Sequence, residues 1–182
     1  MKWNNKFTYP KSSRSLKNGF RHYLFDNNKL PSVTSILQAT KSEEDKAALE
    51  NWKKRVGHFE ANKIKNEASA RGSSMHLHIE MFLKNRINES FFEENEQYKN
   101  MAKEIIDKGI KGKLEEIYGI EATLQNPENK YAGTADLIGV YQGQETIIDF
   151  KQANKPKKVD YIQDYFLQLG RLAPLIFRGA QV

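Results

Sequence analysis

The spacing of apolar residues changes near residue 119, and this change limits the folds that the chain can adopt. Before it, apolar residues recur at helical intervals, as at Leu49, Trp52 and Val56. After it, short apolar stretches alternate with turn-forming residues, a pattern that predicts strands. Helices followed by strands and a last helix indicate an α+β fold. The length of 182 residues suits one domain of this class.

The part before residue 119 is expected to be mostly helical. Ser32 and Ser42 are each placed to cap the N-terminus of a helix. A third helical run begins near Phe59 and meets Gly72, where glycine lowers helix stability. A fourth helix is predicted over residues 97–118, on the spacing of its isoleucines and leucines.

The part after residue 119 is expected to hold a three-stranded antiparallel meander followed by a helix. The strands are predicted over residues 120–125, 131–141 and 144–151, and the helix over residues 161–172. In terms of organisation, residues 1–29 form a basic N-terminal arm and residues 30–182 a single domain. Within that domain we expect a helical wall over 30–118 and a catalytic sheet with its following helix over 119–182.

The net charge of +6 comes from the arm. Residues 1–25 hold six Lys or Arg side chains and no acid, so the arm is attracted to phosphates. Its interleaved aromatic residues either stack on unpaired bases or dock the arm on the core. The same composition is also compatible with a solvated tail or a transit peptide.

Two classes of protein are excluded by composition. The chain has no cysteine, which rules out a disulfide framework and a thiol nucleophile. It also lacks the run of about 20 apolar residues that a membrane-spanning helix needs. We therefore expect no membrane association and a cytoplasmic location, in the host cell if the source is viral; a mitochondrial location is less favoured.

Two carboxylates and a lysine are predicted to meet on the second and third strands. Alternation places Asp149 and Lys151 on one face of their strand. If the hairpin turns at residues 142–143, paired residue numbers sum to 285 and Asp136 lies opposite Asp149. Opposed carboxylates favour a bound cation, and Mg²⁺ prefers oxygen ligands. On spacing alone, a solvent-exposed Asp–Lys pair is the simpler interpretation.

Several motifs in order add a resemblance to a known family. They are G-T-A-D at Gly133–Asp136, I-I-D-F-K at Ile147–Lys151, Gly-x-x-x-His at Gly72–His76, and Gln168 within L-Q-L. Together they resemble the RecB-type nucleases of the PD-(D/E)xK superfamily. Within it, P-S-V-T-S-I-L at Pro31–Leu37, the helix of Trp52 and R-G-S-S-M-H-L-H-I-E at Arg71–Glu80 are similar to the mitochondrial genome maintenance exonucleases and their phage relatives.

The resemblance implies a restriction-endonuclease-like core, a small mixed sheet flanked by helices, and a role for each matched residue. The implied metal ligands are His76, Glu121, Asp136, Asp149 and the backbone carbonyl of Phe150. The implied catalytic residues are Asp136, Asp149, Lys151 and Gln168. The residues expected to bind DNA are Arg71, Lys155, Lys157 and Lys158. A histidine on a helix is by default a partly exposed residue, and a lysine-rich loop is by default solvated.

The function that the resemblance implies is a deoxyribonuclease that depends on Mg²⁺ or Mn²⁺. The expected reaction is exonucleolytic hydrolysis of single-stranded DNA ends during replication, recombination or repair. The alternatives are a non-catalytic module that binds single-stranded DNA and a flap or structure-specific endonuclease. The chain has no P-loop motif, so a helicase or polymerase would be a partner. Family members carry a tyrosine where this chain has Leu172 and continue with a further strand, so a truncated or diverged core is expected.

Overall fold

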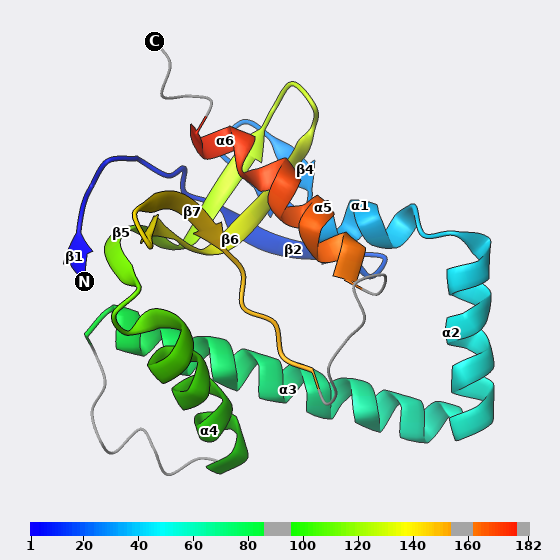
Figure 1. Ribbon diagram of the computed structural model, residues 1–182. Helices are drawn as coiled ribbons and strands as arrows, with labels where there is room; N and C mark the ends of the chain where they lie inside the picture. Colours follow the sequence, from blue (N-terminus) through cyan, green and yellow to red (C-terminus); the bar gives the residue numbers. More distant parts are fainter. Residues whose placement is uncertain (86–95, 154–161, 178–182) are drawn as a thin grey trace. The chain divides into compact units, whose positions relative to one another are not determined.

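The computed structural model describes residues 1–85, 96–153 and 162–177 (Figure 1). The chain forms two compact units: unit 1 contains residues 1–39 and 112–182, and unit 2 contains residues 40–111. The fold is α+β with a mixed sheet and helices, as predicted. No helix in the described ranges combines the length and apolar character that a bilayer crossing requires.

A four-stranded mixed sheet organises unit 1, in the order β1-β5-β6-β7. Its strands are β1 (Lys2–Trp3), β5 (Leu114–Asn126), β6 (Tyr131–Tyr141) and β7 (Gln144–Ile148). The last three strands form the predicted antiparallel meander, while β1 pairs with β5 in parallel and makes the sheet mixed. The turn between β6 and β7 has positive φ angles at Gln142 (49°) and Gly143 (77°), the conformation of a tight two-residue hairpin.

The predicted register between β6 and β7 is confirmed, but β7 is shorter than predicted. Leu137 pairs with Ile148 and Tyr141 pairs with Gln144. The strand ends at Ile148 because the next contact with β6 uses a side chain: the amide of Phe150 donates to Asp136 Oδ2 at 2.7 Å. Residues 149–151 therefore follow the strand and are held by a carboxylate of β6.

The first strand of the meander begins earlier than predicted, and the fourth predicted helix is shorter. Residues 114–118 belong to β5, although Leu114, Ile117 and Tyr118 have helical spacing. The register against β6 shifts between Leu114 and Glu116 and again between Ile117 and Gly119, and such irregularities interrupt the strict alternation of a strand. Apolar residues therefore fall at intervals that imitate a helix.

One face of the main sheet is covered by helices α1 (Val33–Ala39), α5 (Gln163–Leu172) and α6 (Pro174–Phe177). Their apolar side chains form one core with the strands, which includes Val33, Ala122, Leu124, Ala135, Ile138, Leu172 and Ile176. Helix α5 approaches closely because Gly133 has no side chain: a Cβ there would lie 2.7 Å from a methyl group of Leu172. The glycine of the G-T-A-D motif thus has a packing role.

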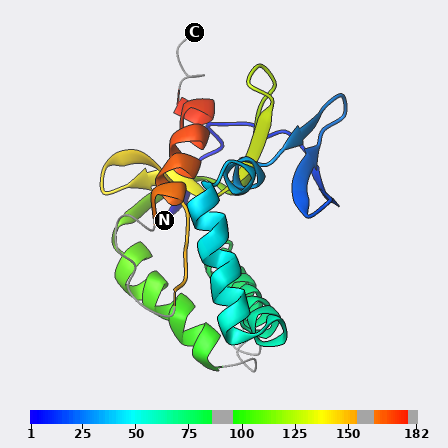
Figure 2. The same cartoon turned by 90° about the vertical axis from the view of Figure 1, so that its right-hand side faces the viewer.

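The basic arm is folded rather than extended in solvent, and Phe7, Tyr9, Tyr23 and Phe25 pack in or against the core clusters of unit 1. Strands β2 (Ser13–Lys17), β3 (Phe20–Leu24) and β4 (Lys29–Pro31) form an antiparallel sheet, seen from a second side in Figure 2. No strands were predicted before residue 119, so this small sheet is an addition to the predicted arm. Tyr23 of β3 is 2% exposed and packs with Leu30 and Ala132.

Unit 2 is helical and contains α2 (Glu43–Val56), α3 (His58–Leu83), α4 (Glu96–Glu104) and the π-helical turn η2 (Ile105–Ile110). Ser42 caps α2 as predicted, accepting a hydrogen bond from the amide of Asp45 at 3.1 Å. Helix α3 runs through Gly72 without interruption. The helical part of this region ends before Gly112, whose φ of 73° is typical of a residue that stops a helix.

Candidate functional site

The predicted Asp–x–Lys segment is assembled at the end of β7. The side chain of Asp149 is only 5% exposed, and both of its oxygens have partners. Gln168 Nε2 donates to Oδ1 at 3.1 Å, and Lys151 forms an ion pair with Oδ2. Gln168 is itself buried on α5. The sheet end and the following helix thus fix one carboxylate and one ammonium group side by side.

Asp136 connects this segment to the neighbouring strand. Its Oδ2 atom accepts the amide hydrogen of Phe150, so the chain after β7 is tied to β6 at this carboxylate. The ladder itself ends at the pair of Leu137 and Ile148, one residue short of the predicted pair of Asp136 and Asp149. Asp149 contacts Gln168 and Lys151 directly, and Asp136 is connected to this group through the backbone amide of Phe150.

Glu121 faces Asp136 from β5. The pairs on either side of it are Ile120 with Leu137 and Ala122 with Ala135, and carboxylate oxygens of Glu121 and Asp136 lie within 4.8 Å of each other. Glu121 has a φ of 50° in the middle of the strand. A glutamate held in this left-handed conformation costs about 1 kcal/mol or more, and such strain clusters at functional sites.

A residue that the sequence did not single out, Arg14, lies beside Glu121. Its Nη2 atom is 3.4 Å from Glu121 Oε2 and 3.1 Å from Thr134 Oγ1. The Tyr23 hydroxyl also bonds Thr134, at 2.9 Å. The hairpin of the basic arm is thereby attached to the sheet face that carries Glu121. The positive charge of the arm was visible in the sequence, but the pairing with Glu121 spans more than 100 residues and had no local signal.

A divalent cation is compatible with the donor set of unit 1. Glu121 and Asp136 present two carboxylates at short range, and this like-charge pair is relieved by a cation between or beside them. Oxygen donors of this kind suit Mg²⁺ or Mn²⁺, whereas a zinc site would favour nitrogen or sulfur ligands. Asp149 does not belong to this close pair, and its two oxygens are engaged by Gln168 and Lys151.

The remaining predicted site residues either belong to unit 2 or fall outside the described residues. His76 and Arg71 are half-buried on α3 of unit 2. Lys155, Lys157 and Lys158 fall outside the described residues. The roles of these five residues stay predictions.

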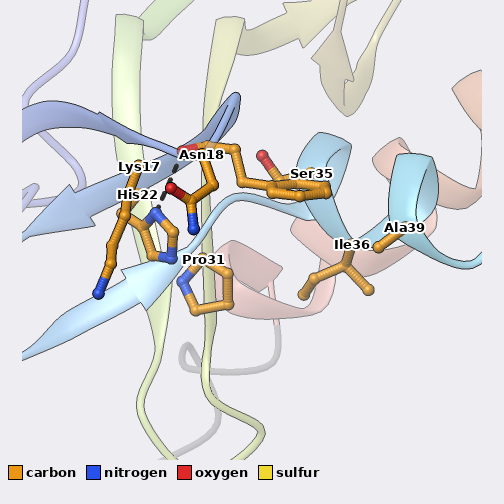
Figure 3. A pocket seen from close by; sticks show the side chains of 8 residues that line it. Lys17, Asn18, His22, Pro31, Ser35, Ile36 and Ala39 are labelled. Atoms are coloured by element: carbon orange, nitrogen blue, oxygen red, sulfur yellow. Dashed lines mark hydrogen bonds between the residues drawn. The ribbon is translucent and has the colours of Figure 1, made fainter.

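A separate hollow lies between the basic hairpin and α1 (Figure 3). It has a volume of about 310 Å³ and is lined by Lys17, Asn18, Phe20, His22, Pro31, Ser35, Ile36 and Ala39. The imidazole of His22 is engaged with the carbonyl of Phe20 at 3.2 Å. The lining is mainly apolar and shares no residue with the carboxylate cluster, so this hollow is not the predicted site.

A half-buried tyrosine, Tyr9, packs against β5 of the main sheet. Tyr9 lies so close to Gly119 that a Cβ on the glycine would meet its ring at 2.7 Å. Its hydroxyl is buried and has no hydrogen-bond partner among the described residues. Burial disfavours the charged phenolate and raises the pKa of Tyr9 from 10 to about 12.

The sequence is similar to named proteins. No protein-family model matches it. It is 31% identical over 137 residues to Mitochondrial genome maintenance exonuclease 1 of Mus musculus, an alignment that covers 71% of this chain and 39% of the relative. The human protein of that name is 29% identical over 146 residues, with 76% and 40% coverage, and that of Xenopus tropicalis 29% over 147 residues, with 77% and 40% coverage. The chain thus spans about 40% of the length of these relatives.

Proposed function

We propose that this chain is a metal-dependent nuclease of the RecB-type PD-(D/E)xK class that hydrolyses single-stranded DNA from its ends. Two independent observations support the proposal. The relatives to which the chain is similar are named exonucleases. The residues that the sequence motifs selected include a connected group at the end of β7, in which Asp149 contacts Lys151 and Gln168 and Asp136 binds the amide of Phe150.

The observation that carries the proposal is the burial of Asp149. A surface Asp–Lys pair would leave its carboxylate in water, but this side chain is 5% exposed and has two partners. Burying a carboxylate is costly unless it is paired and hydrogen-bonded, so a chain that needed only a surface ion pair would gain nothing from this arrangement. A role in holding a substrate or a cation accounts for that cost.

Each residue then has a distinct task. Asp136, Glu121 and Asp149 would hold the divalent ion, with the carbonyl of Phe150 and His76 as the further ligands that the sequence predicts. The bound ion would supply a water of lowered pKa and polarise the scissile phosphate. Lys151 places its ammonium where negative charge develops on the phosphate oxygens, and its ion pair with Asp149 keeps it there.

Gln168 acts through another residue rather than on the substrate. Its amide donates to Asp149 Oδ1 and leaves Oδ2 to Lys151, so it orients the carboxylate between the two groups. Its own burial on α5 restricts its conformations. We expect Gln168 to position the site, with an effect on activity smaller than that of Lys151.

The experiment that tests the proposal is a cleavage assay on end-labelled DNA. Wild type, Lys151→Ala and Lys103→Ala are incubated with single-stranded or duplex DNA in Mg²⁺, Mn²⁺ or EDTA. Lys103→Ala is the matched control because it removes the same charge from an exposed position on α4. We expect short products from single strands that disappear in EDTA and fall by a factor on the order of 100 or more in Lys151→Ala.

The remaining outcomes would select the alternatives. Binding without cleavage in every metal would identify a DNA-binding module on a nuclease scaffold. Efficient cutting of closed circular single strands, or of flaps in preference to linear ends, would indicate an endonuclease. Equal activity of wild type and Lys151→Ala would contradict the proposed site.

A further inference from the structure

Arg14 lies in the candidate site but belongs to the basic arm, which has no part in the proposed cleavage mechanism. It stands on β2, the edge strand of the N-terminal sheet. Its guanidinium reaches Thr134, which is two residues before Asp136 on β6 and shares its face of the strand. It also reaches Glu121, whose carboxylate lies within 4.8 Å of that of Asp136. The arm thus brings a cation to the carboxylate cluster.

A buried aromatic platform holds this arginine in place. Arg14 Cζ lies 5.8 Å from the centroid of the Tyr23 ring, a cation–π distance. Tyr23 is 2% exposed, and its hydroxyl bonds the same Thr134 that Arg14 contacts. The guanidinium is therefore held against the Tyr23 ring and Thr134, while the Arg14 side chain remains 49% exposed.

The present partners of Arg14 use little of its binding capacity. One nitrogen, Nη2, serves both acceptors, at 3.1 and 3.4 Å, whereas strong charge-assisted hydrogen bonds are about 2.7–2.9 Å long. Within the described part of the chain, its remaining N–H groups donate to no side chain or carbonyl. A half-exposed ion pair of this kind is worth about 1 kcal/mol or less.

A phosphodiester would be a better partner than Glu121. The guanidinium fork matches two phosphate oxygens at once, and such bidentate pairs are stronger than a single long contact. We propose that Arg14 is a phosphate-binding residue of this site, which exchanges Glu121 for a phosphate of the nucleic-acid strand when substrate arrives. The exchange releases the Glu121 carboxylate toward Asp136. This inference rests on the proposed function, since it assumes a nucleic-acid strand at the carboxylate cluster.

The test measures binding of a fluorescein-labelled single-stranded oligonucleotide in EDTA by fluorescence anisotropy. EDTA prevents cleavage and removes any effect of metal binding at Glu121. We expect Arg14→Ala to weaken binding about tenfold and Arg14→Lys, which keeps the charge but loses the fork, about threefold. Arg21→Ala is the matched control: it removes an equal charge from an exposed position of the adjacent strand β3, and we expect a change of about twofold or less.

A second variant separates phosphate binding from a purely structural role. If Arg14 only fastens the hairpin to the sheet, Glu121→Gln removes the charge from the same contact, leaves a neutral amide acceptor, and should weaken binding in the same direction as Arg14→Ala. If Arg14 exchanges partners, Glu121→Gln removes its competitor and a repelling charge, and binding should tighten about threefold. Circular dichroism and thermal melting check that all variants are folded.

The outcomes of this test are distinct from those of the cleavage assay. Equal weakening by Arg14→Ala and Arg21→Ala, weaker binding by Glu121→Gln, or no binding by the wild type would each overturn the assignment of Arg14. If the expected binding pattern is found but the wild type cuts no DNA, the phosphate site stands and the proposed nuclease activity fails. If cleavage depends on Lys151 while Arg14 and Arg21 behave alike, only the inference about Arg14 fails.

Discussion

Asp149 and Glu121 are carboxylates of one candidate site, but the fold holds them in opposite ways. The side chain of Asp149 is 5% exposed and has a buried amide and an ammonium as partners. The side chain of Glu121 is 33% exposed and has one arginine contact at 3.4 Å. The backbone of Asp149 follows the end of a strand, whereas that of Glu121 is strained within one. One carboxylate is therefore fixed by the fold, and the other is free to change partners at little cost.

The largest expected difference is in stability. Asp149→Ala leaves the buried Gln168 and the partly exposed Lys151 without their acceptor, and we expect it to lower the free energy of unfolding by about 2 kcal/mol. Glu121→Gln removes only an exposed ion pair and should cost about 0.5 kcal/mol or less. Urea denaturation at neutral pH measures both. Similar losses in the two variants would break the distinction between a fixed and an exchangeable carboxylate.

Substitution of Gln168, which positions the fixed carboxylate of Asp149, should also lower stability and cleavage. Gln168→Ala removes the donor to Asp149 Oδ1, and we expect a loss of about 1–2 kcal/mol in stability together with reduced cleavage. Leu167→Ala is the matched control, because Leu167 is the preceding residue on α5 and is 50% exposed. Urea denaturation and the cleavage assay are applied to both variants. A loss in Leu167→Ala as large as that in Gln168→Ala would assign the effect to the helix rather than to Asp149.

At Glu121, where the backbone is strained, a substitution should raise the free energy of unfolding instead of lowering it. Glycine adopts a φ of 50° without steric cost, so Glu121→Gly is expected to raise the free energy of unfolding by about 0.5 kcal/mol while lowering cleavage. At Thr123, two residues along the strand, no such strain is present, and Thr123→Gly should lower stability by about 1 kcal/mol. Thermal melting of both variants shows whether the two changes have opposite signs. A loss of stability in both variants would mean that the backbone at Glu121 is not strained.

The smallest effect at neutral pH is expected for Tyr9, a buried polar group with no partner among the described residues. Tyr9→Phe should change stability at pH 7 by less than about 0.5 kcal/mol, in favour of the variant. The pKa of Tyr9 is raised from 10 to about 12 in the folded state, so between these values the unfolded chain loses its proton first. Wild type therefore loses stability as the pH rises through this window.

The loss of wild-type stability at alkaline pH tests the role of Tyr9 more sharply than the difference at pH 7. The variant lacks the titrating group and should retain stability that the wild type loses between pH 10 and pH 12. Urea midpoints across this range compare the two proteins. Parallel curves would mean that the Tyr9 hydroxyl is hydrated or bonded in solution.

Local patterns in the sequence were sufficient for the meander and for bringing Asp136 close to the segment of Asp149 and Lys151, whereas the role of Gln168 was implied only by the family resemblance. Turn residues at 142–143 and alternating apolar residues set the register that places Asp136 next to the segment after β7. The helix caps at Ser32 and Ser42 are equally local, and each hydroxyl accepts the expected amide hydrogen. Features determined within about ten residues of sequence were thus predictable.

Features that depend on contacts between residues distant in sequence could not be predicted from local patterns. Polar strand β2 has no apolar alternation of its own, and it is folded because Ser12, Arg14 and Tyr23 contact β5 and β6 more than 100 residues away. The irregular register at the start of β5 produced a helical spacing that local patterns could not distinguish from a helix. The left-handed backbone of Glu121 leaves no trace in residue type, because glutamate is not a residue that prefers it.

The division of unit 1 into two stretches of sequence has a consequence for biosynthesis. Residues 1–39 are synthesised before unit 2, and their partners on β5 and β6 follow only after the whole of unit 2 has been translated. Unit 2 is continuous in sequence and its contacts are available early. The basic segment must therefore wait, uncovered, for more than 70 residues of synthesis. During this interval it is open to nucleic acids and chaperones, so the rate of elongation through residues 40–111 sets how long the nascent chain carries an uncovered cationic segment.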